Sequence, residues 1–157
     1  MATESIEELL EAHRFFAGLD RSQLQSLVGC GRNAAFATGD YLCREGEAAD
    51  VSYIVHRGRV ALEVRLPDRG SIAIDTAGVG EVVGASWPFP PYRWQLDARA
   101  LEPVGAVALD AVCLRDKCDA DPALGYALMK RFAAAVVGRM ASARLRLVDV
   151  YGVARGE

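Results

Sequence analysis

The stretch GDYLCREGEAADVSYIVHRGRV, residues 39–60, decides the fold class. Its three glycines, Gly39, Gly46 and Gly58, separate short runs of apolar residues, and glycine closes tight turns that a residue with a side chain would strain. The runs between them have the composition of β-strands. Turns this closely spaced favour an antiparallel roll, because parallel strands need long crossover connections. We therefore expect a mainly β, jelly-roll-like fold.

Helix signals lie on both sides of this stretch. Ser5 and Asp20 stand at N-cap positions before short apolar periods. Asp110 is expected to cap a further short helix, and Asp121-Pro122 to begin a long one. The expected organisation is one domain, 1–157, with N-terminal helices in 1–30, the β-roll in 34–110 and C-terminal helices in 110–150.

Residues 94–100 alternate with the period of a strand. The alternation places Trp94 and Ala98 on one face and Asp97 and Arg99 on the other. We expect Trp94 to point into the roll and Asp97 to lie on the opposite face of the strand.

The long helix carries an apolar stripe that one small domain cannot cover by itself. Its members recur at spacings of three and four residues. A partner helix from a second copy would bury the stripe, so we expect a homodimer. The alternative is that the first half packs on the roll and the end frays. The stripe consists of Leu124, Leu128, Phe132, Val136, Met140, Ala143 and Leu147.

Composition and charge are ordinary for a soluble globular protein. The 157 residues are 52% hydrophobic and carry a formal net charge of −3. No run of lysine and arginine is long enough to follow a nucleic-acid backbone. No signal sequence or membrane-spanning run is visible, so we expect a cytoplasmic protein without membrane contact.

Cysteines and histidines give no metal or catalytic signal. The four cysteines lack C-x-x-C spacing, and we expect all four to be reduced thiols. A jelly-roll metal enzyme of the cupin type would need two or three histidines together, whereas this chain has only His13 and His56, far apart in sequence. We therefore expect no metal site, no cofactor and no catalytic residues.

Short motifs along most of the chain carry a family resemblance. Together, and in this order, they resemble the cyclic-nucleotide-binding domain of the catabolite-activator and nitrogen-fixation-regulator superfamily. The resemblance implies an eight-stranded antiparallel β-roll with a long C-terminal dimer helix, and a regulatory, non-catalytic role in sensing cyclic AMP, cyclic GMP or a related small phosphate. The motifs are Phe16-Ala-Gly-Leu19, Gly39-Asp40, Glu45-Gly46-Glu47, Gly58-Arg-Val60, Gly80-Glu81, Arg99-Ala-Leu-Glu-Pro103 and Leu147-Val-Asp-Val150.

In the family, a Gly-Glu pair opens a one-turn helix that faces the cyclic phosphate. The resemblance places Gly80 at that helix and Glu81 on the ribose hydroxyl, with Gly84 and Ala85 beside the ligand. The alternative for Glu81 is a loop carboxylate that caps the N–H of residue 83 or 84.

The position of the family's phosphate-binding arginine is changed. Counting back from the Arg99 motif places Trp94 there and Gln95 next to it. Arg93 lies one residue earlier and reaches the phosphate only if a bulge shifts the strand register. Otherwise Arg93 is a surface cation, near Asp97.

Two further departures concern the C-terminal part. The purine-contacting positions of DNA-binding relatives fall on Gly138, which has no hydroxyl, and on Arg139, which would either stack on a base or be solvated. In those relatives a helix-turn-helix domain follows, whereas this sequence stops at Glu157. We expect no DNA binding by this chain and an unidentified downstream protein.

A loop rich in aromatic residues and prolines precedes the last strands. Its rings are expected to pack in the core and close the pocket, with ligand stacking, filling of the pocket or a partner surface as alternatives. The stiff prolines also remove N–H donors from the phosphate cradle. A binding-incompetent relative that acts as a dimeric interaction module is therefore the alternative to a ligand sensor. The rings are those of Trp87, Phe89, Tyr92 and Trp94.

Overall fold

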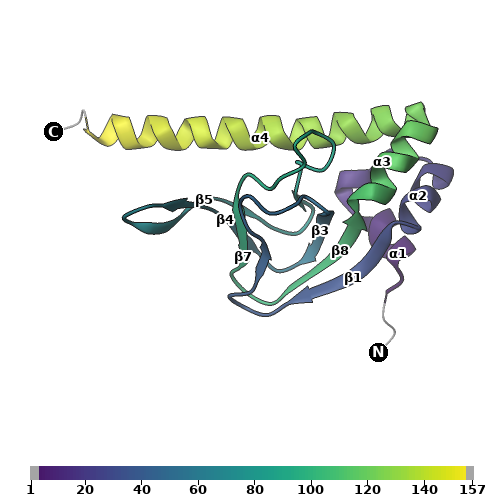
Figure 1. Cartoon of the computed structure of the whole chain (residues 1–157), viewed down its shortest axis with the longest axis horizontal. Coiled ribbons are helices and arrows are strands. Elements are labelled where there is room, and N and C mark those ends of the chain that lie inside the picture. The colour runs from purple at the N-terminus through teal and green to yellow at the C-terminus, as the bar shows by residue number, and fades with distance from the viewer. Residues whose placement is uncertain (1–3, 155–157) are drawn as a thin grey trace.

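The computed structural model describes residues 4–154 and contains two four-stranded antiparallel sheets that form a β-roll (Figure 1). The predicted domain limits, 1 and 157, lie outside the described residues. One sheet has the strand order β1 (Gly31–Phe36), β8 (Val104–Asp110), β3 (Val51–Arg57) and β6 (Val82–Val83). The other has the order β2 (Tyr41–Cys43), β7 (Asp97–Ala100), β4 (Val60–Leu66) and β5 (Gly70–Ala77).

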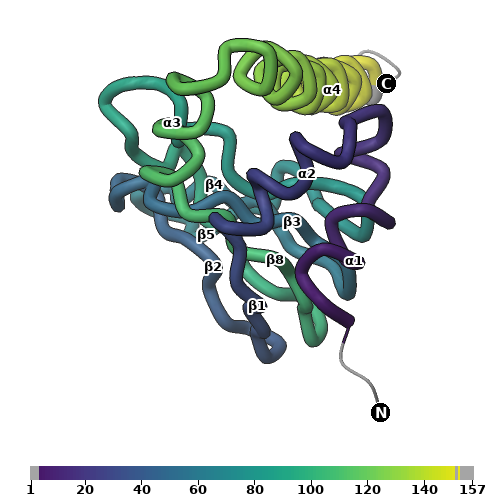
Figure 2. Tube along the Cα trace, turned by 90° about the vertical axis from the view of Figure 1, so that its right-hand side faces the viewer, coloured from purple at the N-terminus to yellow at the C-terminus, as the bar shows by residue number. Residues whose placement is uncertain are grey.

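The helices gather at one end of the roll and across its top (Figure 2). Every predicted cap is confirmed. Ser5 and Asp20 form capping boxes, Asp110 accepts from the N–H of residue 113, and Asp121 accepts from the N–H of residue 124. The helices are α1 (Ile6–Ala12), the 3-10 helix η1 (Arg14–Phe16), α2 (Arg21–Val28), α3 (Ala111–Ala120) and α4 (Pro122–Ala154).

The sheet that contains β3 and β8 is buried on both faces. Ile54 and Val107 pack against the helices, whereas Val55 and Ala106 face the interior of the roll. Strands covered on both sides read as continuous apolar runs rather than alternating ones. This sheet therefore joins the helical layer and the roll interior into one folding unit.

The three glycines of the deciding stretch all have positive φ, as predicted. Gly58 shows why a side chain is excluded, because a Cβ there would lie 2.3 Å from the carbonyl oxygen of Pro103.

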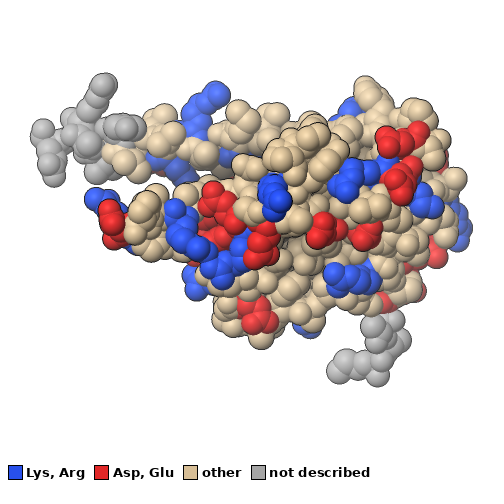
Figure 3. All heavy atoms as spheres, viewed as in Figure 1, with Lys and Arg blue, Asp and Glu red and all other residues tan. Residues whose placement is uncertain are grey.

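Charged side chains of both signs are interspersed over the face of the molecule in Figure 3. No helix among residues 4–154 is both long enough and apolar enough to cross a membrane.

Two strand boundaries differ most from the prediction, by three residues each. β1 begins at Gly31, three residues before the expected start of the roll, and pairs along its whole length with β8. β7 begins at Asp97, so Trp94 lies in the preceding loop.

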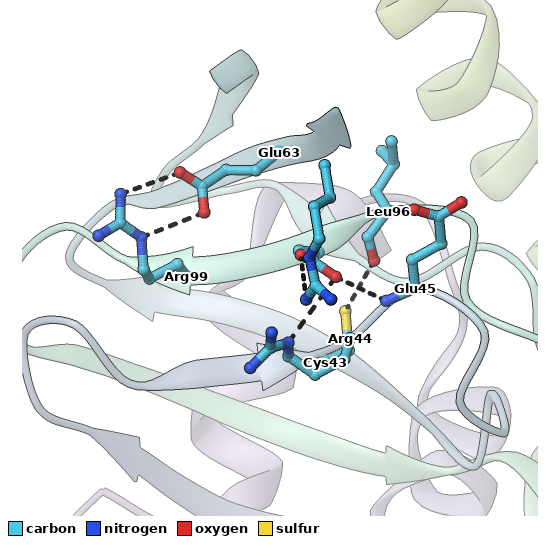
Figure 4. A network of polar contacts seen from close by, with 8 residues as sticks. Cys43, Arg44, Glu45, Glu63, Leu96 and Arg99 are labelled. Atoms are coloured by element: carbon cyan, nitrogen blue, oxygen red, sulfur yellow. Dashed lines mark hydrogen bonds and ion pairs between the residues drawn. The ribbon is translucent and has the colours of Figure 1, made fainter. Parts of the chain in front are cut away.

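Asp97 is buried, although alternation along β7 places it on the face opposite Ala98. Its side chain is 1% exposed, accepts from the N–H of Glu45 at 2.7 Å, and lies 3.3 Å from Arg65 and 3.9 Å from Arg44. Nearby, Glu63 is 3% exposed, and its two carboxylate oxygens accept from Nε and Nη2 of Arg99 at 3.1 and 2.9 Å (Figure 4). Cations from neighbouring strands thus compensate two buried carboxylates.

The prediction of four reduced thiols is wrong for two of them. Cys30 and Cys113 form a disulfide that joins the end of the N-terminal helices to the first turn of α3. Cys43 and Cys118 are free. Burial raises the pKa of the Cys43 thiol to about 12, so this thiol is protonated at neutral pH.

α4 is one continuous helix of 33 residues, roughly 50 Å long at 1.5 Å per residue. The alternative of a frayed end is not seen, because the helix continues to Ala154. Leu124, Leu128 and Phe132 are buried at 0–2% exposure, while Met140 and Leu147 are 60% and 58% exposed. The structure contains one chain, so pairing of this stripe with a second copy stays a prediction.

Candidate functional site

A cavity of about 490 Å³ lies between the roll and α4. The roll supplies Leu62 and Ala98 from its sheet, and the loop after β6 supplies a second wall. Val136, Met140 and Ala143 of α4 form the third wall. Six of the eight predicted site residues line this cavity, namely Gly84, Ala85, Arg93, Trp94, Gln95 and Arg139.

Trp94 points into the roll, as predicted, and is 6% exposed. Its indole packs directly on Gly84, where a Cβ would lie 2.3 Å from the ring. Gly84 has φ +109°, and its carbonyl accepts from the hydroxyl of Ser52 at 2.9 Å. A side chain at residue 84 is therefore excluded twice, by backbone conformation and by the indole.

Arg93 lines the cavity as an exposed cation, and it forms no ion pair with Asp97 among residues 4–154. A single bridge pairs Arg93 with Ala48, and its Nη1 donates to the carbonyl oxygen of Gly46 at 3.0 Å. The side chain is exposed, and the amide of Gln95 donates to the backbone carbonyl of Arg93 at 3.1 Å. The turn at Gly46 thus orients the only cation that the loop contributes to the cavity lining in the described chain.

Arg139 is half-buried rather than solvated. Its Nη2 donates to the carbonyl oxygen of Val82, which ties α4 to the short strand β6. Burial lowers the pKa of Arg139 below its usual value, and the charges of Asp75 and Glu81 partly offset that effect. The side chain lines the cavity on one side of α4 and a second hollow on the other.

Gly80 and Glu81 lie in that second hollow, a groove of about 560 Å³ that the sequence did not predict. The carboxylate of Glu81 accepts from the N–H of Gly78 at 2.7 Å. The alternative expectation of a loop carboxylate thus holds, but it caps residue 78 rather than residue 83 or 84. The carbonyl of Gly80 accepts from Arg14 at 3.1 Å. α4 therefore separates the Gly-Glu pair from the other predicted residues except Arg139, which lies on α4 and lines both hollows.

The segment after Glu81 has no one-turn helix of the kind that the resemblance implies; β6 is followed by turns and loop up to residue 96. Core packing is confirmed for two of the four rings, because Trp87 and Trp94 are buried at 1% and 6% exposure. Phe89 and Tyr92 are 60% and 36% exposed, and Arg115 stacks over Tyr92 at 4.4 Å.

Sequence reasoning missed two groups of residues around α4. It did not place Val136 and Met140 at the ligand cavity, because it assigned them to a dimer contact. It also missed Arg14 and Arg131, which line the groove beside Glu81. The available signal was the spacing of three and four residues along the stripe, and this spacing does not specify which side of the helix is covered.

Comparison with known proteins identifies the family of the fold. Residues 34–121 match the cyclic nucleotide-binding domain family. A crystal structure named as a candidate cyclic nucleotide-binding protein from Geobacter metallireducens GS-15 superimposes with a TM-score of 0.76 at 30% identity, over 88% of this chain and 99% of that one.

Two curated relatives differ in kind, because one is a transcriptional regulator and the other is a channel subunit. The CRP-like cAMP-activated global transcriptional regulator of Mycobacterium tuberculosis is 25% identical over 96% of this chain and 74% of its own length. One polypeptide of a cyclic nucleotide-gated cation channel of Drosophila melanogaster is 32% identical over 49% of this chain. That match spans only 11% of the channel polypeptide.

Proposed function

The chain belongs to the cyclic nucleotide-binding domain family, and we propose that it is a non-catalytic sensor domain in which a small ligand sets the position of α4. One observation carries the proposal: the cavity has walls from both the roll and the helix. A ligand there touches Ala85 on one side and Met140 on the other. It shifts the equilibrium of α4 by its difference in affinity for two positions of the helix.

Cyclic AMP and cyclic GMP are the first ligands to test. Family membership and the six predicted residues around one cavity support them. Binding in the usual family manner would need Glu81 at the ribose, and that carboxylate lies in the groove across α4. A nucleotide would therefore use an atypical cassette with Arg93 and Arg139 at its anionic end.

The test combines a thermal shift with hydrogen exchange. Ligand at a hundred times its dissociation constant stabilises the folded state by about 2.7 kcal/mol. The same ligand should change the exchange rates of amides 136–148 in α4. Binding without any change in these amides would contradict the sensor role.

The second candidate is a binding-incompetent relative that works as a dimeric interaction module. The buried indole of Trp94 at the family's arginine position favours it. Under this proposal the exposed half of α4 pairs with a second copy and presents a surface to an unidentified downstream protein. Trp94→Arg should then create nucleotide affinity that the natural chain lacks.

The dimer is tested by the mass in solution. We expect light scattering to give twice the chain mass, and Leu147→Glu on the exposed stripe to give the monomer. Asp149→Asn, on the same exposed stretch of helix, is the matched control. A monomer before any substitution would contradict the pairing.

A cytoplasmic location and the lack of DNA and membrane contacts stay predictions. The Cys30–Cys113 disulfide removes the argument from reduced thiols, because disulfides are rare in the cytosol. Recovery of the protein from fractionated cells, with its thiols blocked at lysis, tests location and disulfide together.

A further inference from the structure

The charges around the cavity are unbalanced. Arg93 and Arg139 line it, and no aspartate or glutamate does so among the residues that the structure describes. Neither arginine forms an ion pair among residues 4–154. Each uses one N–H group for a backbone carbonyl, and a guanidinium has five N–H donors, so both retain donors for an anion.

The remaining lining is almost wholly apolar. Leu62, Trp94 and Met140 belong to three different walls, and Phe89 with two prolines covers the loop side. A volume of about 490 Å³ lies in the usual range for small-molecule sites. Flat rings pack favourably on indole and on a methionine thioether.

A sugar has few partners in this cavity. The carboxylate of Glu81 lies across α4, and that of Asp97 is 1% exposed and already bonded to the N–H of Glu45 and to Arg65. Among the described lining residues, the only uncharged side chains that carry an oxygen or nitrogen atom for hydrogen bonding are those of Ser86, Gln95 and Trp94. Ribose hydroxyls buried here would lack the acceptor that the family supplies.

From this lining, and resting on the proposed sensor function, we propose that the natural ligand class is an aryl anion. Such a molecule has a flat apolar ring system and one acidic group, without a sugar. The ring system fills the space between Trp94 and Met140. The acidic group pairs with Arg139 or with the exposed Arg93. Arg139 is half-buried beside apolar walls, and a cation there attracts an anion more strongly than one in water does.

Two fluorescent probes with one ring skeleton test the proposal. 1-Anilinonaphthalene-8-sulfonate carries a sulfonate, and N-phenyl-1-naphthylamine is the same skeleton without it. We expect one sulfonate probe per chain and at least tenfold weaker binding of the neutral probe. Equal affinities would overturn the proposal, because the arginines would then play no part.

Four substitutions locate the site. Ala143 lines the cavity but is exposed, so Ala143→Trp should fill the cavity without disturbing the core. It should weaken binding of the sulfonate probe at least tenfold. Ala141→Trp, on the same helix but outside the lining, is the control. Arg139→Gln or Arg93→Gln should reduce the preference for the sulfonate probe over the neutral probe. Because Arg93 is exposed, Arg93→Gln is expected to fold even if Arg139→Gln loosens the attachment of α4. If Ala143→Trp leaves the affinity for the sulfonate probe unchanged, the probe binds outside this cavity, and the proposal is overturned.

Competing ligands separate this proposal from the sensor function. Displacement of the probe by cyclic AMP at lower concentration than by naphthalene-1-sulfonate would overturn the aryl class, and so would tighter binding of dodecanoate, an aliphatic acid. If the probe binds as expected but leaves the exchange of amides 136–148 unchanged, the ligand class holds and the sensor function fails. If cyclic AMP alone changes these amides, the sensor function holds and the aryl class fails.

Discussion

The two halves of α4 contrast sharply although they belong to one helix. In the first half, Phe132 is 2% exposed and packs edge-on against Phe15 and Trp87, with ring centroids 4.9 and 5.3 Å away. In the second half, Met140 and Leu147 are mostly exposed, and two arginines make polar contacts to the roll. The first half is part of the core, whereas the second half is attached mainly through a few hydrogen bonds.

This difference assigns separate tasks to the halves. Large apolar side chains bury the first half in the core, and loss of one such side chain costs several kcal/mol of stability. The attachments of the second half are each worth about 1 kcal/mol, which a ligand can outweigh. The comparison therefore predicts that substitutions in the first half unfold the protein and those in the second half free the helix.

The sharpest test compares one substitution in each half. Phe132→Ala should lower the free energy of unfolding by about 3–5 kcal/mol, because it leaves a cavity beside two aromatic rings. Met140→Ala, its control, should change the free energy by no more than about 0.5 kcal/mol. Urea unfolding followed by circular dichroism measures both. Similar losses in the two variants would break the comparison.

Removal of the disulfide tests how firmly the buried half is anchored. The bond joins residues 83 apart, so its loss should cost about 2–4 kcal/mol through the entropy of the unfolded chain. Cys30→Ala with Cys113→Ala, or dithiothreitol, should give the same loss in urea unfolding. Cys118→Ala serves as the control. A reducing agent that leaves the unfolding midpoint unchanged would show that the bond is absent in solution.

Acid should weaken the same buried side. The Nδ1 of His13 accepts from the N–H of Phe15, and its Nε2 lies 2.8 Å from the carbonyl of Val55. Burial lowers the pKa of His13 below 6.5, so as the pH falls the unfolded chain takes up the proton first. The stability from neutral His13 is thus complete above pH 6.5 and is lost as the pH falls through the lowered pKa.

The change is measured as the slope of the unfolding free energy between about pH 7.5 and 5, the range that spans the ordinary histidine pKa. His13→Gln should make this slope shallower. The total change in unfolding free energy that the substitution removes over this pH range should be smaller than the loss caused by removal of the disulfide. His56→Gln should have a weaker effect of the same sign, because burial lowers its pKa as well. A slope identical to that of the natural chain in His13→Gln would exclude this residue as a source of the acid sensitivity.

The smallest expected effect concerns the exposed half. Arg146 donates to the carbonyl of Ile74 and lies 3.4 Å from the carboxylate of Asp75, with half of its side chain exposed. Arg146→Gln should cost less than about 1 kcal/mol of stability. It should nevertheless speed hydrogen exchange of amides 143–150, with amides 124–132 as the internal control. Equal acceleration in both segments would mean that α4 opens as one unit.

Local chemistry made much of the fold predictable. The limits of β4 follow from Gly58 before it and the turn at residues 67–69 after it, and Asp121-Pro122 begins the long helix as its residue types indicate. The start of β1 was missed because Gly31, Arg32 and Asn33 have no strand composition; pairing with β8 decides it.

The errors at the site have non-local causes. Asp97 is buried because arginines from other segments neutralise it, and Cys30 meets Cys113 across 83 residues that carry no spacing signal. Gly80 and Glu81 match the family motif, yet the course of α4 places them in a different hollow from Trp94. Sequence reasoning identified the motif residues individually, but their grouping depends on the path of a helix that begins about 40 residues later.

The close contact between Gly84 and Trp94 has a consequence for how this domain can evolve. Any side chain at residue 84 requires a smaller partner at residue 94, and exchange of the indole for a slimmer group leaves a void beside a bare backbone. The two positions are thus expected to change together among descendants of this gene, with single replacements disfavoured as intermediates. A lineage that acquires an arginine at residue 94 should carry a compensating replacement next to it.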